Sequence, residues 1–172
     1  SGLGVDFRKR FWMKLDLDRQ ESGRSELALG GTLDLGMPAG SPTKANLAGT
    51  LVVQNLESRF LLSGTLVANG RAECGRCLEE FEIQWDVPVD LMVLRDVDTD
   101  ETESETLLIL QQKGEVDLRP ALRECAVLGY PLAVVCQADC RGLCPDCGID
   151  RNRGTCDCEE QDVDPRWEGL PG

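Results

Sequence analysis

The cysteines constrain this chain more than any other residue type, because eight of the nine lie in closely spaced sets and the chain has no histidine. The eight are Cys74, Cys77, Cys136, Cys140, Cys144, Cys147, Cys156 and Cys158. A structural zinc ion usually takes four side-chain ligands, so these cysteines predict two all-sulfur sites and two Zn²⁺ ions per chain. Such a site has no open coordination position, which favours a scaffold over a catalyst.

The spacing also predicts how the cysteines divide between the two ions. The first expected site consists of Cys144, Cys147, Cys156 and Cys158. It closes a loop of modest length, so ordering it costs little entropy. The second expected site consists of Cys74, Cys77, Cys136 and Cys140. It would tie a β-rich region to the C-terminal segment, although a simple packing role for Cys136 and Cys140 is an open alternative.

Local sequence around the CxxC pairs supports the metal interpretation. Pro145 restricts the turn of the Cys144–Cys147 pair, and Gly148 accepts the positive φ that such a knuckle often needs. The ninth cysteine, Cys125, falls on the apolar face of an expected helix and is predicted to be a buried free thiol.

Disulfide bonds and redox chemistry are the alternatives for the cysteines. An odd number of cysteines, a chain of 172 residues and the lack of an apolar secretory h-region at its start disfavour a disulfide framework. A thiol redox protein or redox sensor would place a CxxC at a helix N-terminus, and neither CxxC precedes a helical pattern. No apolar stretch is long enough for a membrane span. We therefore expect a cytoplasmic, reducing location and no membrane association.

Charge bears on the class of partner. The formal net charge is −13. Eight thiolates holding two divalent ions would bring it to about −17. This charge disfavours binding of a nucleic-acid backbone over the whole surface, but it is compatible with a basic protein partner or with a local basic patch. Candidates for that patch are Arg71, Arg76, Arg141, Arg151 and Arg153.

Hydrophobic periodicity predicts a mainly β protein. Alternating patterns predict strands over 12–18, 27–35 and 81–94, and stretches rich in Leu and Val predict strands over 47–56 and 60–68. Gly30-Gly31 suggests a bulge or bend, Asn69-Gly70 a turn or bulge, and Pro88 an edge or bulged strand. A helix is expected near 118–128, capped by Asp117 and ended by Gly129 and Pro131.

The fold class expected from these patterns is mainly β with minor α (α+β). A twisted antiparallel β-region carries a zinc-ribbon-like C-terminal module. We expect a β-rich domain over 1–130, with an acidic loop near 96–105, and a cysteine-rich zinc-binding module packed on it over 131–172. The acidic loop lacks the glycine and final glutamate of a calcium loop.

Signals for catalysis are absent from the sequence. Without histidine there is no Ser-His or Cys-His nucleophile system, and no glycine-rich phosphate-binding motif is present. We therefore predict that the chain is not an enzyme and takes no small-molecule substrate.

The cysteine motifs together resemble those of the YceD family. The resemblance is carried by Cys74-x-Arg76-Cys77-Leu78-Glu79-x-Phe81, by Cys136-x3-Cys140-x-Gly142-Leu143-Cys144-Pro145-x-Cys147-Gly148-x-Asp150-x-Asn152, by Cys156-x-Cys158 and by Asp164-Pro165-Arg166-Trp167. It covers roughly residues 45–170, and Arg151 stands where an apolar residue is expected. The resemblance implies a role in large ribosomal subunit biogenesis and large-subunit rRNA accumulation. The partner would be a ribosomal protein, a pre-ribosomal particle or large-subunit rRNA.

Overall fold

A computed structural model describes residues 13–20, 22–57, 59–94, 107–110 and 114–158. The expected acidic loop at 96–105, Trp12 and the Asp164–Trp167 motif lie outside these residues. The described part of the chain contains no helix with the length and apolarity of a membrane span.

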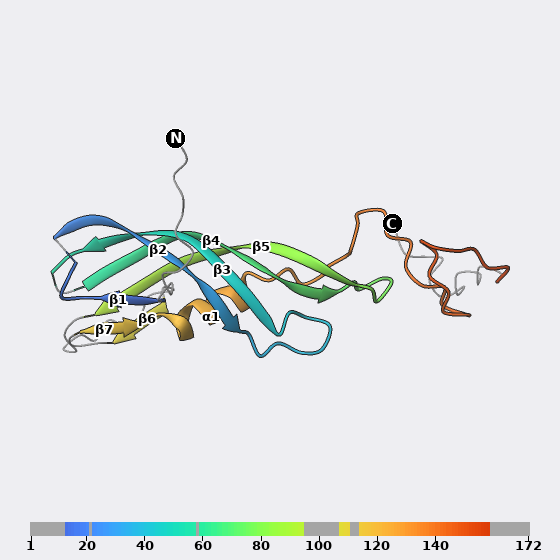
Figure 1. Ribbon diagram of the computed structural model, residues 1–172, viewed down its shortest axis with the longest axis horizontal. Helices are drawn as coiled ribbons and strands as arrows, with labels where there is room; N and C mark the ends of the chain where they lie inside the picture. Colours follow the sequence, from blue (N-terminus) through green and yellow to red (C-terminus); the bar gives the residue numbers. More distant parts are fainter. Residues whose placement is uncertain (1–12, 21, 58, 95–106, 111–113, 159–172) are drawn as a thin grey trace, which may run out of the picture.

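A five-stranded sheet forms most of the structure (Figure 1). Its strands, in spatial order, are β2 (Gly23–Asp34), β3 (Lys44–Asn55), β4 (Arg59–Glu73), β5 (Glu80–Leu94) and β6 (Leu107–Leu110). The first four form an antiparallel meander, whereas β6 pairs in parallel with the last four residues of β5. The predicted antiparallel β-region is confirmed, and the parallel strand is an addition that the sequence patterns did not indicate.

One face of this sheet is covered by a two-stranded ribbon and the helix. The ribbon pairs β1 (Lys14–Asp16) with β7 (Glu115–Asp117), and α1 (Arg119–Leu128) follows directly. Leu15 of the ribbon and Leu122 of the helix are fully buried in the same core cluster as Phe60 of the sheet. Each such side chain contributes about 1.5–3 kcal/mol through burial, so this packing holds the layers together.

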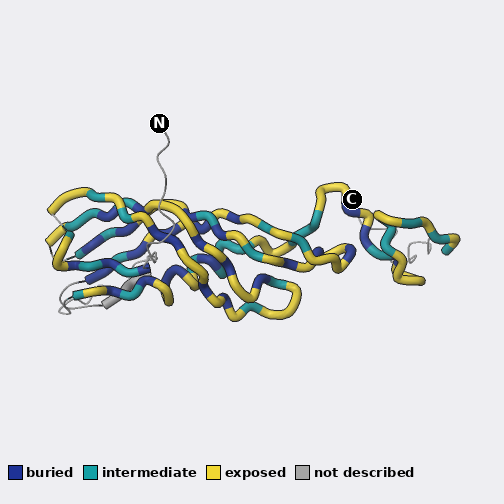
Figure 2. Tube along the Cα trace, viewed as in Figure 1, coloured by how far each residue is buried: buried dark blue, intermediate teal, exposed yellow. Residues whose placement is uncertain are grey.

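The period-two pattern of the strands explains why only one face is buried. Leu47, Ala68 and Trp85 are in register across three strands and point into the core. Their neighbours Asn46 and Asn69 point to the opposite, exposed face. Figure 2 shows this alternation of buried and exposed positions along the strands. No polar or charged residue is buried within the described ranges.

The structure has neither a bulge at Gly30-Gly31 nor a turn or bulge at Asn69-Gly70. Strand β2 keeps one-to-one register with β3 through Gly30 and Gly31, so no bulge occurs there. Strand β4 continues through Asn69 and Gly70 instead of turning. A Cβ at Gly70 would lie 2.9 Å from Pro42 Cβ, so the glycine serves the close approach of the β2–β3 loop.

Pro88 occupies an edge position, as predicted. Strand β6 covers β5 only at 91–94, so none of the described strands pairs with Pro88 on the side of β5 away from β4. A proline has no N–H to donate to a ladder, and this position requires none. The register around Pro88 shows no bulge.

The helix lies close to its predicted place but begins differently. Leu118 is the N-cap, not Asp117, and it makes no side-chain capping hydrogen bond. Asp117 instead accepts a 3.0 Å hydrogen bond from the N–H of Arg119. Cys125 is a free thiol packed against the core, as predicted, but it is only partly buried. The reason is that the small helix presents Ala121, Leu122 and Ala126 to the sheet and leaves Cys125 beside that face.

Candidate metal centres

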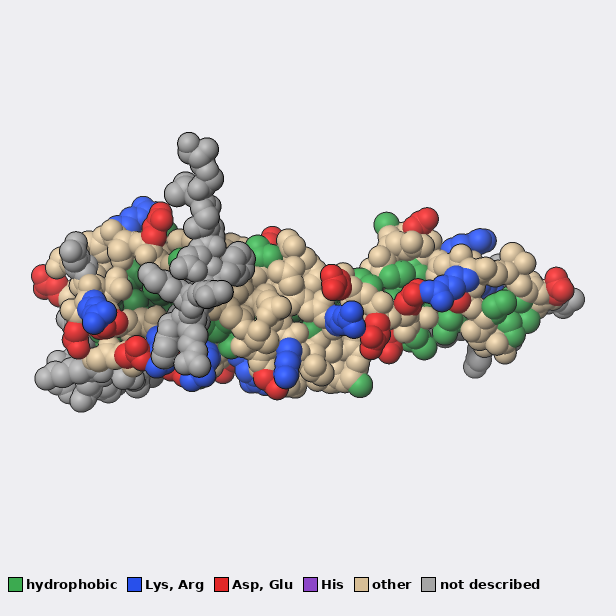
Figure 3. Space-filling view, viewed as in Figure 1, with side chains coloured by type: hydrophobic (Ala, Val, Ile, Leu, Met, Phe, Trp, Pro, Cys, Tyr) green, Lys and Arg blue, Asp and Glu red, His purple; other side chains and the backbone are tan. Residues whose placement is uncertain are grey.

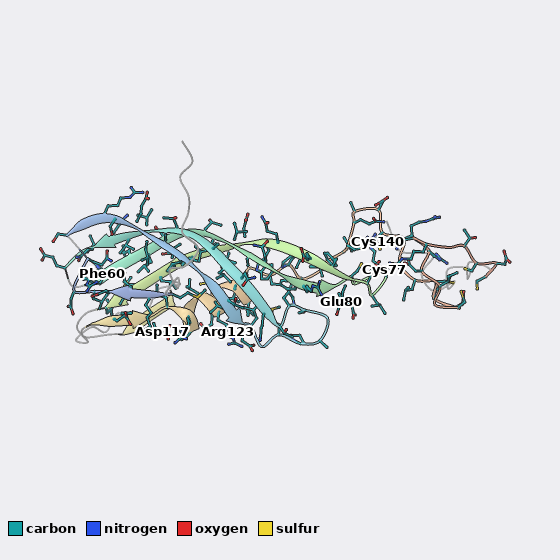
Figure 4. The ribbon with its side chains drawn as sticks, viewed as in Figure 1. Phe60, Cys77, Glu80, Asp117, Arg123 and Cys140 are labelled. Carbon is teal, nitrogen blue, oxygen red and sulfur yellow. The ribbon has the colours of Figure 1, made fainter. Side chains whose placement is uncertain are left out.

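The first group of cysteines, called here the proximal tetrad, consists of Cys74, Cys77, Cys136 and Cys140. Cys74 and Cys77 lie in the turn that joins β4 to β5, immediately after Glu73. The other two come from the segment after α1, which runs back along the molecule to this turn (Figure 1). The N–H of Gly75 donates to the carbonyl of Val134 at 2.9 Å, which fixes the segment against the turn. Figure 4 shows Cys77 and Cys140 side by side at this junction.

The sulfur positions of the proximal tetrad fit a four-coordinate metal ion. The Cys74 and Cys140 Sγ atoms are 3.8 Å apart, and those of Cys77 and Cys136 are 3.6 Å apart. All four lie within 4.8 Å of one another. A tetrahedral zinc ion with Zn–S bonds of about 2.3 Å requires sulfurs about 3.8 Å apart. The distances are too long for disulfide bonds, and all nine cysteines are unpaired.

Backbone groups around the proximal tetrad stabilise a thiolate. The N–H groups of Arg76 and Cys136 donate to Cys74 Sγ at 3.4 and 3.3 Å. Burial of Cys74 opposes its ionisation, but backbone hydrogen bonds outweigh burial and lower its pKa to about 6. Burial and the neighbouring Cys77 raise the pKa of Cys136 to about 12. In the metal-free protein Cys136 therefore keeps a proton that a bound cation must displace.

The second group, called here the distal tetrad, consists of Cys144, Cys147, Cys156 and Cys158. Their sulfurs also lie within 4.8 Å of one another. A small hairpin positions the first pair, because Leu143 bridges to Asp150 and the N–H of Cys144 donates to the carbonyl of Ile149 at 2.9 Å. Gly148 has φ +74°, as its place after the CxxC pair predicted. The tetrads are the two groups of four expected from spacing.

The distal tetrad is more exposed than the proximal one. Cys144 is buried, Cys147 is exposed, and Cys156 and Cys158 are half-buried. Backbone N–H groups of Cys147 and Asp146 lower the pKa of Cys144 to about 6. The neighbouring Cys147 and burial raise the pKa of Cys158 to about 12. The pattern of one ionised and one strongly protonated sulfur thus repeats in both tetrads.

Arginine side chains contact this region in ways that the sequence did not indicate. Arg151 is directed to the distal tetrad, with Nη2 3.8 Å from Cys144 Sγ. Arg76 Nη1 donates to the carbonyl of Cys140 at 2.9 Å, and Arg153 forms ion pairs with Glu79 and Asp150. A cation beside a sulfur ligand complements thiolate charge, which explains an arginine where an apolar residue was expected.

The arrangement suits metal binding better than thiol redox catalysis. Within the described residues, neither CxxC lies at the N-terminus of a helix. The two sulfurs with lowered pKa values, Cys74 and Cys144, are 0% and 2% exposed. A redox nucleophile must be reached by its partner, so buried thiolates facing three other sulfurs favour coordination.

Comparisons with known proteins agree with the cysteine motifs. The family model described as "Large ribosomal RNA subunit accumulation protein YceD" matches residues 62–172. An uncharacterised protein of Mycobacterium tuberculosis is 33% identical over 121 residues, which are 70% of this chain and 58% of that protein. The large ribosomal RNA subunit accumulation protein YCED homolog 1, chloroplastic, of Arabidopsis thaliana is 30% identical over 56 residues, or 33% of this chain and 17% of that protein.

A protein of Mycobacterium leprae, also uncharacterised, is 28% identical over 99 residues, which are 57% of this chain and 46% of that protein. The chain therefore spans less than two thirds of the length of these curated relatives. No solved structure matches the chain.

Proposed function

This chain belongs to the YceD family of large ribosomal RNA subunit accumulation proteins, and from that premise we propose that it is a non-enzymatic zinc-binding factor that assists large ribosomal subunit biogenesis. The observation that carries the metal part is the pair of compact four-cysteine groups, each with all sulfurs within 4.8 Å. Zinc is the metal that four thiolates in tetrahedral geometry favour. The ion would supply folding energy to the segment after α1 and would leave no coordination position for a substrate.

The partner that the charges favour is a basic ribosomal protein, alone or in a precursor particle. The chain carries 31 acidic and 18 basic residues. Three of the five arginines considered for an RNA-binding patch are engaged within the protein: Arg76 with Cys140, Arg151 with Cys144, and Arg153 with Glu79. On the face shown in Figure 3, basic side chains are interspersed with acidic ones and form no continuous basic surface. Binding would be electrostatic and weakened by salt.

Free thiols ready to hold zinc suit a reducing compartment, so we place this function in the cytoplasm. A role as a thiol redox protein is the less favoured candidate, because the lowered-pKa sulfurs are buried.

Metal content and partner capture test the two parts separately. Elemental analysis of tag-free protein is expected to give two zinc ions per chain, and a value of zero would refute the metal part. Affinity capture from lysate at low salt, followed by mass spectrometry, is expected to recover large-subunit ribosomal proteins or precursor particles. A variant with Cys77→Ser and Cys147→Ser is the matched control, because it disrupts both tetrads and leaves the sheet intact. Recovery of no ribosomal component by the zinc-loaded chain would refute the ribosomal part.

Binding to rRNA is measured alongside, with large-subunit rRNA fragments retained on a filter. Charge reversal at Arg141 and Arg71 tests the two candidate arginines whose side chains make no described hydrogen bond or ion pair. If the chain binds rRNA tightly and both reversals weaken that binding, the direct partner is rRNA and not a ribosomal protein.

A further inference from the structure

A side chain of the distal loop contacts a sulfur of the proximal tetrad. Asn152 lies between Cys147 and Cys156 in sequence, within the loop that the distal tetrad closes. Its Nδ2 is 3.4 Å from the Sγ atom of Cys140, which belongs to the proximal tetrad. The distal loop therefore supplies a hydrogen-bond donor to a sulfur of the other centre.

The orientation of the Asn152 amide is determined on both sides. Its Oδ1 accepts a 2.8 Å hydrogen bond from the N–H of Arg141, the residue that follows Cys140. Its Nδ2 donates to Asp150 Oδ1 at 2.7 Å as well as to the sulfur. A flipped amide would face the N–H of Arg141 with its own NH₂ group, so only one orientation satisfies these partners.

The position of Asn152 depends on the distal loop. The N–H of Asn152 donates to Asp150 Oδ1 at 2.9 Å, and the N–H of Arg151 donates to the carbonyl of Gly142 at 2.9 Å. These contacts place the 150–154 turn against the short link between the tetrads. This link, residues 141–143, is also held to the turn that carries Cys74 and Cys77, because the N–H of Leu143 donates to the carbonyl of Arg76 at 3.1 Å.

We propose that Asn152 is a positioning residue that couples the two metal centres, so that filling the distal tetrad strengthens metal binding at the proximal tetrad. The proposal rests on the metal part of the proposed function. A metal ion at the distal tetrad orders the loop that carries Asn152, and the ordered amide donates its hydrogen bond to the Cys140 sulfur that would hold the proximal ion. Hydrogen bonds from such outer residues typically change metal affinity 10–100-fold. Because coupling between sites is reciprocal, proximal binding strengthens distal binding by the same factor.

The test uses the full chain and cadmium-113 as the probe, so that each tetrad is followed by its own resonance. Affinities are measured by competition with a chelator. The distal tetrad is disabled by the double variant Cys156→Ser with Cys158→Ser. Asn152→Ala removes the contact between Asn152 and the Cys140 sulfur. The control is Asn69→Ala, which removes the same amide from the exposed face of the sheet. We expect both the disabled-distal variant and Asn152→Ala to weaken proximal binding by about 10-fold, and the control to leave it unchanged.

Further outcomes separate coupling from mere loss of structure. In the loaded wild type, the side-chain N–H protons of Asn152 are expected to show scalar coupling to the proximal cadmium through Cys140 Sγ, a signature that a purely structural role would not produce. Proximal affinity that is the same with and without a working distal tetrad would overturn the proposal, even if Asn152→Ala disrupts the distal loop. If the two tetrads bind metal independently, the coupling is refuted and the metal part of the proposed function stands. If neither tetrad binds metal, the metal part of the proposed function is refuted.

Discussion

The indole Nε1 of Trp85 donates a 3.0 Å hydrogen bond to the carbonyl oxygen of Ala126, and this contact joins the middle of β5 to the end of α1. The ring of Tyr130 packs edge-on against the same indole, with centroids 5.2 Å apart. Together these contacts direct the chain after α1 back along β5, toward the turn that holds Cys74 and Cys77. The proximal tetrad therefore depends on a core contact as well as on its own cysteines.

Replacement of Trp85 is expected to weaken metal binding from a distance. Trp85→Phe leaves the Ala126 carbonyl without its donor and should cost about 1–3 kcal/mol of unfolding free energy. It should also lower proximal metal affinity, because Cys136 and Cys140 are no longer held in register with the turn. Denaturant unfolding and metal competition measure the two effects. The control is Phe60→Leu, a core change at the end of the sheet remote from Cys77 (Figure 4). Equal metal affinities in the two variants would contradict this prediction.

Removal of metal should disorder the cysteine segment and spare the sheet. Metal binding at such sites is largely folding free energy. A chelator is therefore expected to abolish amide protection at Cys136, Cys144 and Gly148, while the N–H groups of Leu62 and Leu91 in the sheet stay protected. Hydrogen exchange measures both sets in one experiment. Cys125→Ser, which alters the cysteine outside both tetrads, should respond like the wild type. Protection at Cys144 and Gly148 that survives complete metal removal would argue against coordination as the organising force.

Metal uptake should release protons and strengthen as pH rises. In the metal-free protein the pKa values of Cys74 and Cys144 are about 6, so both are ionised at neutral pH. The pKa values of Cys136 and Cys158 are about 12, so both carry protons that the metal must displace. Each proton released raises the logarithm of the binding constant by about one per pH unit. Below pH 6 the dependence should steepen, because Cys74 and Cys144 also become protonated. Calorimetry in buffers of different ionisation enthalpy counts the protons, and a count of zero would contradict the prediction.

Introducing a glycine after the first CxxC pair and removing the glycine after the second should have opposite effects on stability. Leu78 and Gly148 each directly follow a CxxC pair. The N–H of Leu78 donates to the carbonyl of Cys74 at 3.0 Å, and the N–H of Gly148 donates to the carbonyl of Cys144 at 2.9 Å. Both have positive φ, +60° and +74°. A left-handed conformation costs an L-residue about 1–2 kcal/mol, and Leu78 is 56% exposed, so little packing offsets that cost.

Leu78→Gly is therefore expected to stabilise the loaded protein by about 0.5–1 kcal/mol, after allowance for the greater backbone entropy of glycine. Gly148→Ala, the converse change, should destabilise by a similar amount. Thermal unfolding of the zinc-loaded forms measures both. A destabilising Leu78→Gly would show that the exposed leucine contributes packing that outweighs its backbone strain.

Local rules explain where sequence reasoning succeeded. The alternating strands, the edge position of Pro88 and the positive φ of Gly148 follow from properties of one residue or of its neighbours in the chain. The distal tetrad followed from spacing, because four sulfurs within a short loop meet at low entropic cost, and the proximal tetrad was the set that remained. Asn152 belonged to the recognised motif, but nothing in the sequence alone indicated a contact with Cys140.

The predictions that failed are those in which strand pairing with distant residues competes with a local preference. Asn69-Gly70 has the composition of a turn, yet fifteen register pairs with β5 hold β4 extended through it. Asp117 has the chemistry of an N-cap, but pairing of Glu115–Asp117 with β1 keeps it in a strand, and the helix begins after Leu118. In both places pairing with another strand outweighs a local preference worth about 1 kcal/mol.

The sequence by itself determined that this protein is β-rich, that it holds two sets of four cysteines and that its motifs are those of one family. These properties reside in periodicity and spacing, which are local and additive. Only the tertiary structure decided that β6 runs parallel to β5, that Trp85 directs the second half of the proximal tetrad to the first, and that Asn152 joins the two tetrads. Each of these brings together residues distant in the chain, and their meeting depends on how the whole core packs.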